Sequence, residues 1–212
     1  MDILVKFKNI LFETLKDNKK LIIGLYILFI ICFIASWILS ASRIEFIASN
    51  FPVVNNTVST NMGDGADVFH ILFNNVWGGI VTYILSIFFA IPAFVLLIYN
   101  GVNLGVIGQL FSQVIPNGGL RYIVYIIPHG IFEITATVLQ SVAGVLLFLF
   151  IWRLIKAWRS SQTQGISDAF DKTKQLLIQS IVLMIFSTIL LIIAAPIEIY
   201  FSVPFSQFIL GV

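Results

Sequence analysis

Charged side chains are scarce in this chain of 212 residues. Twelve lysines and arginines and ten aspartates and glutamates make up 10% of the sequence, while hydrophobic residues make up 59% and the mean hydropathy is +1.02. Average globular chains carry about 25% charged residues. The shortage of charge therefore excludes an ordinary soluble domain and predicts a polytopic membrane protein.

Three further absences narrow the class of protein. The net charge of +2 is small and no basic cluster is interleaved with exposed aromatic residues, so nucleic acid is not an expected partner. Disulfides give no information on the fold, because the chain has a single cysteine, Cys32, inside an apolar run. The first long apolar run has no clear cleavage site, so it is expected to be a retained anchor rather than a secretory signal peptide.

The apolar runs predict an all-α transmembrane fold with about five membrane-spanning helices in a single domain, residues 1–212. A hydrocarbon core of about 30 Å needs about 20 helical residues. The expected spans are residues 21–41, 78–99, 102–115, 131–152 and 176–201. Asn100-Gly101 is a turn signal between the second and third spans, and the short third span must tilt or recruit neighbouring residues. Residues 1–18 are amphipathic, which predicts either a helix in the membrane interface or a polar extension of the first span.

Positive charge predicts the orientation of these spans. Lysines at 16, 19 and 20 precede the first span, and cations at 153, 156 and 159 follow the fourth. Because cytoplasmic loops are enriched in lysine and arginine, we expect a cytoplasmic N-terminus, an external loop at residues 42–69, a cytoplasmic loop at 153–175 and a C-terminus outside. The location implied is the cell membrane.

One apolar stretch, residues 127–134, contains a backbone interruption and two ionisable groups. Pro128 lacks a backbone N–H and Gly130 tolerates unusual dihedrals, which predicts a broken helix just before the fourth span. His129 and Glu133 are four residues apart and would share one helix face. Ionisable groups are costly in a membrane span unless they are buried in protein or functional. This stretch is therefore the strongest candidate site.

The predicted topology brings other polar groups to a similar depth. Asn74 and Asn75 lie at the outer start of the second span, and Glu198 lies near the outer end of the fifth. If the bundle closes, these three could meet His129 and Glu133 in one polar cluster. A different group of residues is expected to break or pack helices, since small residues permit close approach. That group is Pro128, Gly130, Asn100, Gly101, Gly105 and Gly144.

Three interpretations of the His129–Glu133 pair stay open. The pair could form a buried hydrogen bond that locks a broken helix to its neighbours, or it could relay or couple protons. The third interpretation, a metal site, is the least favoured, because zinc needs three or four ligands and the other histidine, His70, lies in or beside the external loop. No HExxH motif is present, so neither catalytic residues nor cofactors are expected.

Several short elements resemble a known family in their order and spacing. They are Phe73-Asn74-Asn75, Asn100-Gly101 with Leu104-Gly105, Pro128-His129-Gly130 with Glu133, Ala143-Gly144, and Ala194-Ala195 with Ile197-Glu198. From about residue 69 to 204 the chain resembles the stage II sporulation protein M family of integral membrane proteins. Two positions depart from the pattern: Gln140 stands where a small residue is expected, and Pro196 interrupts the Ala-Ala…Glu element.

The resemblance implies a helical membrane protein with no established catalytic activity. Founding members of the family act in spore-forming bacteria with peptidoglycan-degrading partners during engulfment of the forespore. We therefore expect a non-enzymatic component of an envelope-remodelling or membrane-organising complex. Its expected partners are the lipid bilayer, other membrane or envelope proteins, and further copies of itself in a homo-oligomer. The alternative is a transporter or channel-like protein that uses Glu133 and His129 for ion or proton coupling.

Overall fold

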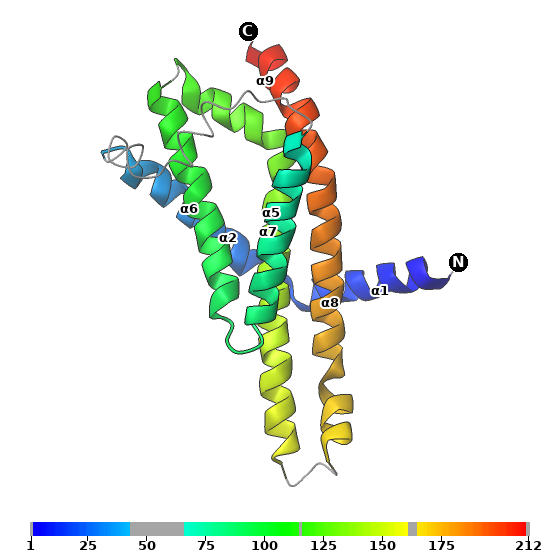
Figure 1. The fold of residues 1–212 in the computed structure, drawn as a ribbon. Helices are drawn as coiled ribbons and strands as arrows, with labels where there is room; N and C mark the ends of the chain where they lie inside the picture. Colours follow the sequence, from blue (N-terminus) through cyan, green and yellow to red (C-terminus); the bar gives the residue numbers. More distant parts are fainter. Residues whose placement is uncertain (1, 43–65, 115, 161–164, 211–212) are drawn as a thin grey trace.

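The computed structural model describes residues 2–42, 66–114, 116–160 and 165–210, which are helical apart from short connections (Figure 1). In chain order the elements are α1 (Asp2–Asp17), α2 (Lys19–Ser40), α5 (Ala66–Leu85), α6 (Ile91–Val114), α7 (Gly118–Trp158), α8 (Ile166–Ile197), the π-helical turn η1 (Glu198–Ser202) and α9 (Val203–Leu210). No strand occurs in these described ranges. The predicted all-α transmembrane fold is confirmed.

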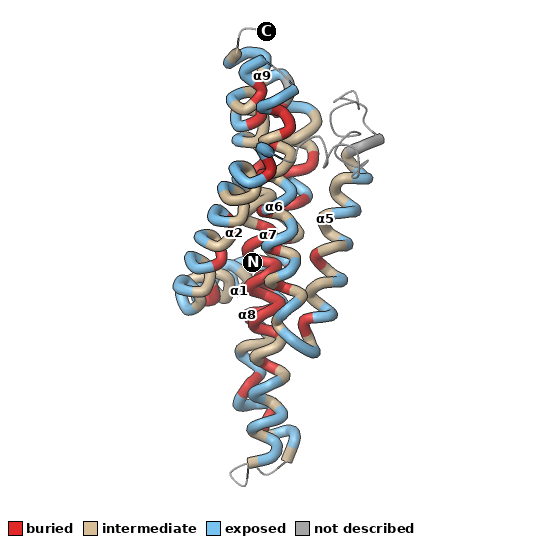
Figure 2. The backbone as a smooth tube through the Cα atoms, turned by 90° about the vertical axis from the view of Figure 1, so that its left-hand side faces the viewer, coloured by how far each residue is buried: buried red, intermediate tan, exposed pale blue. Residues whose placement is uncertain are grey.

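Five helices are long and apolar enough to cross a membrane, as predicted. They are α2, residues Val68–Leu85 of α5, α6, α7, and α8 together with η1. Large apolar side chains such as Ile27 and Ile31 of α2 are more than half exposed, which suits a surface that faces lipid. The buried residues lie mostly along α7 and α8, in the centre of the bundle (Figure 2).

The turn between the second and third spans is not where the sequence suggested. α5 ends at Leu85 and α6 begins at Ile91, so residues 86–90 make the turn, and Asn100-Gly101 lies inside the 24-residue helix α6. The expected spans 78–99 and 102–115 are therefore wrong, as is the helix break at Asn100. Pro92 occupies the first turn of α6, where its missing N–H costs nothing. Asn100 is accommodated within the helix because its Nδ2 donates to the Leu96 carbonyl oxygen at 2.9 Å.

Glycines on one face of α6 allow α2 to approach closely. Gly101, Gly105 and Gly108 are all buried, and each faces backbone or side-chain atoms of α2. A Cβ atom at Gly101 would lie 3.0 Å from the Phe29 carbonyl oxygen, and at Gly105 it would overlap the Phe33 carbonyl oxygen. Without a strong hydrophobic driving force inside lipid, such small-residue faces let helices gain van der Waals contact.

The two loops predicted from charge are largely helical where the structure describes them. α7 continues to Trp158 and α8 begins at Ile166, so most of residues 153–175 belongs to these two helices rather than to a loop. α7 and α8 run side by side and extend together beyond the other helices (Figure 1). At the other end, residues 66–69 of the expected external loop are already part of α5, while residues 43–65 lie outside the described part.

The amphipathic helix α1 ends beside α8 and extends away from it, across the long direction of the bundle (Figure 1). Gln179 of α8 donates from Nε2 to Asp17 Oδ2 at 3.0 Å and holds the end of α1 against the bundle. Leu4 and Phe12 are 82% and 71% exposed. Exposed apolar side chains on a helix lying across the bundle axis fit a position in the membrane interface.

Candidate functional site

The Pro-His-Gly element produces a bend in α7 rather than a break. α7 is helical from Gly118 to Trp158 with Pro128 inside it, and its first part crosses the top of the bundle before the helix turns down beside α8 (Figure 1). Pro128 has no N–H to donate to the carbonyl of Val124, one turn earlier, and proline is a usual cause of such kinks. The predicted half-helix before the fourth span is thus the first arm of one bent helix.

His129 lies at the bend and is buried, with 3% of its surface exposed. Its Nδ1 atom is 2.9 Å from the hydroxyl oxygen of Ser202 in η1. The Ser202 hydroxyl donates to the Ile197 carbonyl oxygen at 3.1 Å. If Nδ1 carries the imidazole proton, Ser202 accepts this hydrogen bond and Nε2 is the ring atom with a lone pair.

Glu133 follows His129 by one helical turn, on the same face of α7. Asn75 of α5 donates from Nδ2 to Glu133 Oε1 at 3.0 Å. This hydrogen bond joins two helices whose residues are 58 positions apart. A carboxylate–amide bond of this kind gives the half-buried Glu133 a polar partner that lipid could not supply.

Glu198 reaches the same place from the opposite helix. One ligand atom of each of His129, Glu133 and Glu198 lies within 4.8 Å of the others. Glu198 opens η1, two residues after the α8 proline Pro196. The missing N–H of proline favours a widened turn at this point, and such π-helical turns occur frequently at functional sites. Pro196, which departs from the family pattern, therefore does not turn Glu198 away from the cluster.

Tyr125 completes the cluster from one turn before His129. Its hydroxyl group lies near the Glu198 carboxyl group. Its ring packs edge-on against the His129 imidazole, with centroids 5.2 Å apart. The polar cluster of this protein thus consists of Asn75, Tyr125, His129, Glu133, Glu198 and Ser202, from α5, α7 and η1.

Asn74 is the predicted member that does not join the polar cluster. It is exposed, and its Nδ2 lies 3.2 Å from Nδ1 of His70 on the same helix. Tyr125 and Ser202 were missed by the sequence reasoning. A signal for Tyr125 existed, because positions 125, 129 and 133 recur every four residues and share a helix face. Ser202 gave no such signal, since its role depends on the π-helical turn.

The electrostatics of the cluster are unusual for an apolar bundle. Among the described residues, the two ion pairs are Lys172–Asp168 and Lys174–Asp171, both on α8 far from the cluster. Glu133 and Glu198 therefore face each other without a lysine or arginine partner. Such a pair of carboxyl groups must share a proton or bind a cation, because two bare carboxylates at this depth would be very costly.

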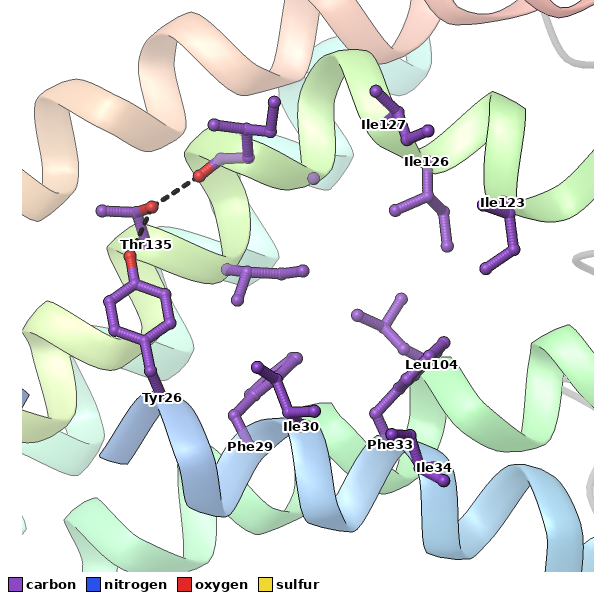
Figure 3. Close-up of a pocket in the computed structure, with 13 residues that line it drawn as sticks. Tyr26, Phe29, Ile30, Phe33, Ile34, Leu104, Ile123, Ile126, Ile127 and Thr135 are labelled. Carbon is purple, nitrogen blue, oxygen red and sulfur yellow. Dashed lines mark hydrogen bonds between the residues drawn. The ribbon is translucent and has the colours of Figure 1, made fainter. Parts of the chain in front are cut away.

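The opposite face of the bent part of α7 is apolar. A cavity of about 500 Å³ lies there between α2, α6 and α7 (Figure 3). At one end the Tyr26 hydroxyl donates to Thr135 Oγ1 at 2.6 Å, and Thr135 donates to the Ile131 carbonyl oxygen (Figure 3). The rest of the lining is Phe29, Ile30, Phe33, Ile34, Leu104, Ile123, Ile126, Ile127, Gly130, Ile131 and Ile134. At the bend of α7, His129 and Glu133 therefore lie on the face with the polar cluster, and neither lines this cavity.

Below the polar cluster the interior contains both apolar and small polar side chains. Ser180 of α8 donates to the Ala143 carbonyl oxygen at 2.8 Å and lies 2.8 Å from the Tyr83 hydroxyl of α5. Gln140, the residue that departs from the family pattern, is 4% exposed and packs against Gly79 of α5. The small residue at 79 makes room for the large one at 140. The Nε2 atom of Gln140 has no hydrogen-bond partner among the described residues.

Comparison with known proteins agrees with this architecture. The model of the family described as stage II sporulation protein M matches residues 25–203, a range that contains the whole polar cluster. An uncharacterized protein of Methanocaldococcus jannaschii is 33% identical over 128 residues, which is 59% of this chain and 65% of that protein. The chain thus matches slightly less than two thirds of that relative's length. No solved structure matches. Because the family model covers most of the chain, the protein belongs to the stage II sporulation protein M family.

Proposed function

We propose that this protein is a non-enzymatic integral membrane component of a complex that organises or remodels the cell envelope. The observation that carries the proposal is the extension of α7 and α8 beyond the other helices (Figure 1). The part of α7 after the bend, residues 128–158, is about 45 Å long at 1.5 Å per residue. The hydrocarbon core is about 30 Å thick, so a helix of this length that starts at one face of the core extends about 15 Å past the other.

The surface of this extension suits contact with another protein. Trp158, Ile166 and Phe170 are 55%, 61% and 41% exposed, and Arg159 and Asp168 lie between them in the sequence. Apolar side chains that project among charges beyond the bilayer are typical of protein interaction sites. The hairpin is the surface through which we expect the complex to form.

The cations of the hairpin also support an orientation. Arginines and lysines favour the cytoplasmic side, so we place the hairpin and the N-terminus in the cytoplasm and the C-terminus outside. The polar cluster then lies in the outer half of the bundle. Its hydrogen bonds connect α5 to α7 and α7 to η1, which fixes the relative positions of the helices that carry the hairpin.

Site-specific photo-cross-linking in native membranes tests this proposal. A photoreactive phenylalanine analogue is placed at Phe170 of the hairpin and, as a control, at Ile27, an exposed lipid-facing position of α2. We expect a discrete protein adduct from Phe170 and none from Ile27. If both positions give only lipid adducts in a folded, membrane-inserted protein, the hairpin is not a partner surface and the proposal fails.

A second candidate function is ion or proton coupling. The observation that favours it is the approach of Glu133 and Glu198 to within 4.8 Å of each other and of His129, because paired ionisable groups at membrane depth often mark ion pathways. Proteoliposomes that contain a pH-sensitive dye distinguish the two functions. Proton or cation flux that is abolished by Glu133→Gln would support coupling, while flux equal to that of protein-free vesicles would leave the complex-forming role.

A further inference from the structure

The polar cluster contains three side chains of the types that bind metal ions, brought together from two separate helical elements. We infer that His129, Glu133 and Glu198 bind a divalent first-row transition-metal ion, with zinc as the probe. The sequence argued against a metal because the only other histidine is His70. The third ligand is instead a carboxylate, Glu198, which α8 and η1 bring to the site from 65 residues further along the chain. This inference goes beyond the proposed function and does not depend on it.

The geometry needs only a small adjustment to hold an ion. Zinc lies about 2.0–2.2 Å from imidazole nitrogen and carboxylate oxygen, so neighbouring ligand atoms of a tetrahedral site are about 3.4 Å apart. The three ligand atoms of the cluster are all within 4.8 Å of one another. Closing the remaining gap requires at most about 1.4 Å, which rotation of the two glutamate side chains can supply without moving the helices.

Charge balance favours a divalent cation over other occupants. Two carboxylates and a neutral imidazole carry a charge of −2, which a divalent ion neutralises. Neither Glu133 nor Glu198 forms an ion pair with a lysine or arginine among the residues that the structure describes. The donor set of one nitrogen and two oxygens selects the kind of ion, because imidazole suits zinc and its neighbours whereas magnesium and calcium prefer oxygen alone.

The neighbours of the ligands are arranged as in metal sites. A ligating histidine usually donates its other ring N–H to an acceptor, which fixes the tautomer and the ring orientation. Ser202 Oγ lies 2.9 Å from Nδ1 of His129, where it can accept that bond. Ligating carboxylates are themselves hydrogen-bonded, and Asn75 donates to Glu133 at 3.0 Å. Glu133 and Glu198 are partly buried, so their side chains retain room to turn toward an ion.

The test is a zinc titration of the full chain, purified in detergent without a histidine tag and stripped of metal by a chelator. Zinc is added in competition with a chromophoric chelator, and bound metal is counted by mass spectrometry. We expect one zinc per wild-type chain. Glu198→Gln keeps the shape of the side chain but removes its charge, and we expect at least a hundredfold loss of affinity. His70→Ala removes the other histidine and serves as the matched control, with affinity unchanged.

Two further measurements keep the inference testable if Glu198→Gln fails to fold by circular dichroism and gel filtration. Ser202→Ala should weaken zinc binding about 10- to 100-fold, as for other partners of ligating histidines. X-ray absorption of the wild-type zinc complex should show nitrogen and oxygen ligands at about 2.0–2.1 Å with imidazole scattering, and no sulfur. The inference is overturned if the wild type binds no stoichiometric zinc, if folded Glu198→Gln binds as the wild type does, if imidazole scattering is absent, or if His70→Ala loses the metal.

Discussion

The close packing of α2 on α6 makes a sharp prediction about Gly105. In Gly105→Ala the new Cβ would overlap both the Phe33 carbonyl oxygen and Ser36 Oγ, and would lie 2.9 Å from the backbone nitrogen of Trp37. A clash with a side chain can be relieved by a change of rotamer. A clash with backbone atoms can only be relieved by moving one helix away from the other.

The expected change in the free energy of unfolding follows from two opposing effects. Overpacking a filled interface costs about 1–3 kcal/mol, and the upper end applies here because the backbone of α2 is involved. Alanine in place of glycine in a helix recovers up to about 1 kcal/mol of helix propensity. We therefore expect Gly105→Ala to lower the free energy of unfolding by about 2 kcal/mol, which is about a thirtyfold change in the equilibrium constant.

Gly24 of α2 provides a matched control. A Cβ atom at Gly24 would have nothing within 4 Å, so Gly24→Ala should leave stability unchanged or raise it by up to about 1 kcal/mol. Both variants can be compared by reversible unfolding in mixed micelles with increasing dodecyl sulfate, followed by far-ultraviolet circular dichroism. If Gly105→Ala is as stable as the wild type and as Gly24→Ala, the interface is looser than described and the reasoning is wrong.

Three further predictions concern polar groups and can be checked in the same unfolding assay. Asn75→Ala removes the donor to Glu133 and should cost about 1–3 kcal/mol, because the carboxyl group loses its partner; stability equal to that of the wild type would show that the bond is unimportant. Gln140→Met should raise stability by about 1 kcal/mol, since it replaces a buried and unpaired Nε2 with an apolar group of similar length; a loss of stability would indicate a partner for that amide. Ser180→Ala removes the bond with the Tyr83 hydroxyl and should cost about 1 kcal/mol, and a second substitution, Tyr83→Phe, should add little to it.

The number of membrane-spanning helices could be predicted because its cause is local. A run of about 20 apolar residues must be shielded from water wherever it lies in a chain, so the apolar runs, together with the positions of the cations, led to five membrane helices. The position of the second turn was wrong because Asn100-Gly101 is a local turn signal that the packing overrides. Gly101 and Gly105 face α2, and a continuous α6 buries them, whereas a turn at Asn100 would lose that contact.

The candidate site, too, could be predicted only in part from the sequence. The sequence by itself determined that His129 and Glu133 share a helix face, because four residues make about one turn of helix. It could not determine that Glu198, Asn75 and Ser202 meet them or that Asn74 does not. Those contacts depend on how α5 and α8 are rotated about their own axes and on the widened turn after Pro196. Rotation of a helix is set by the side chains it packs against, and only the tertiary structure brings those together.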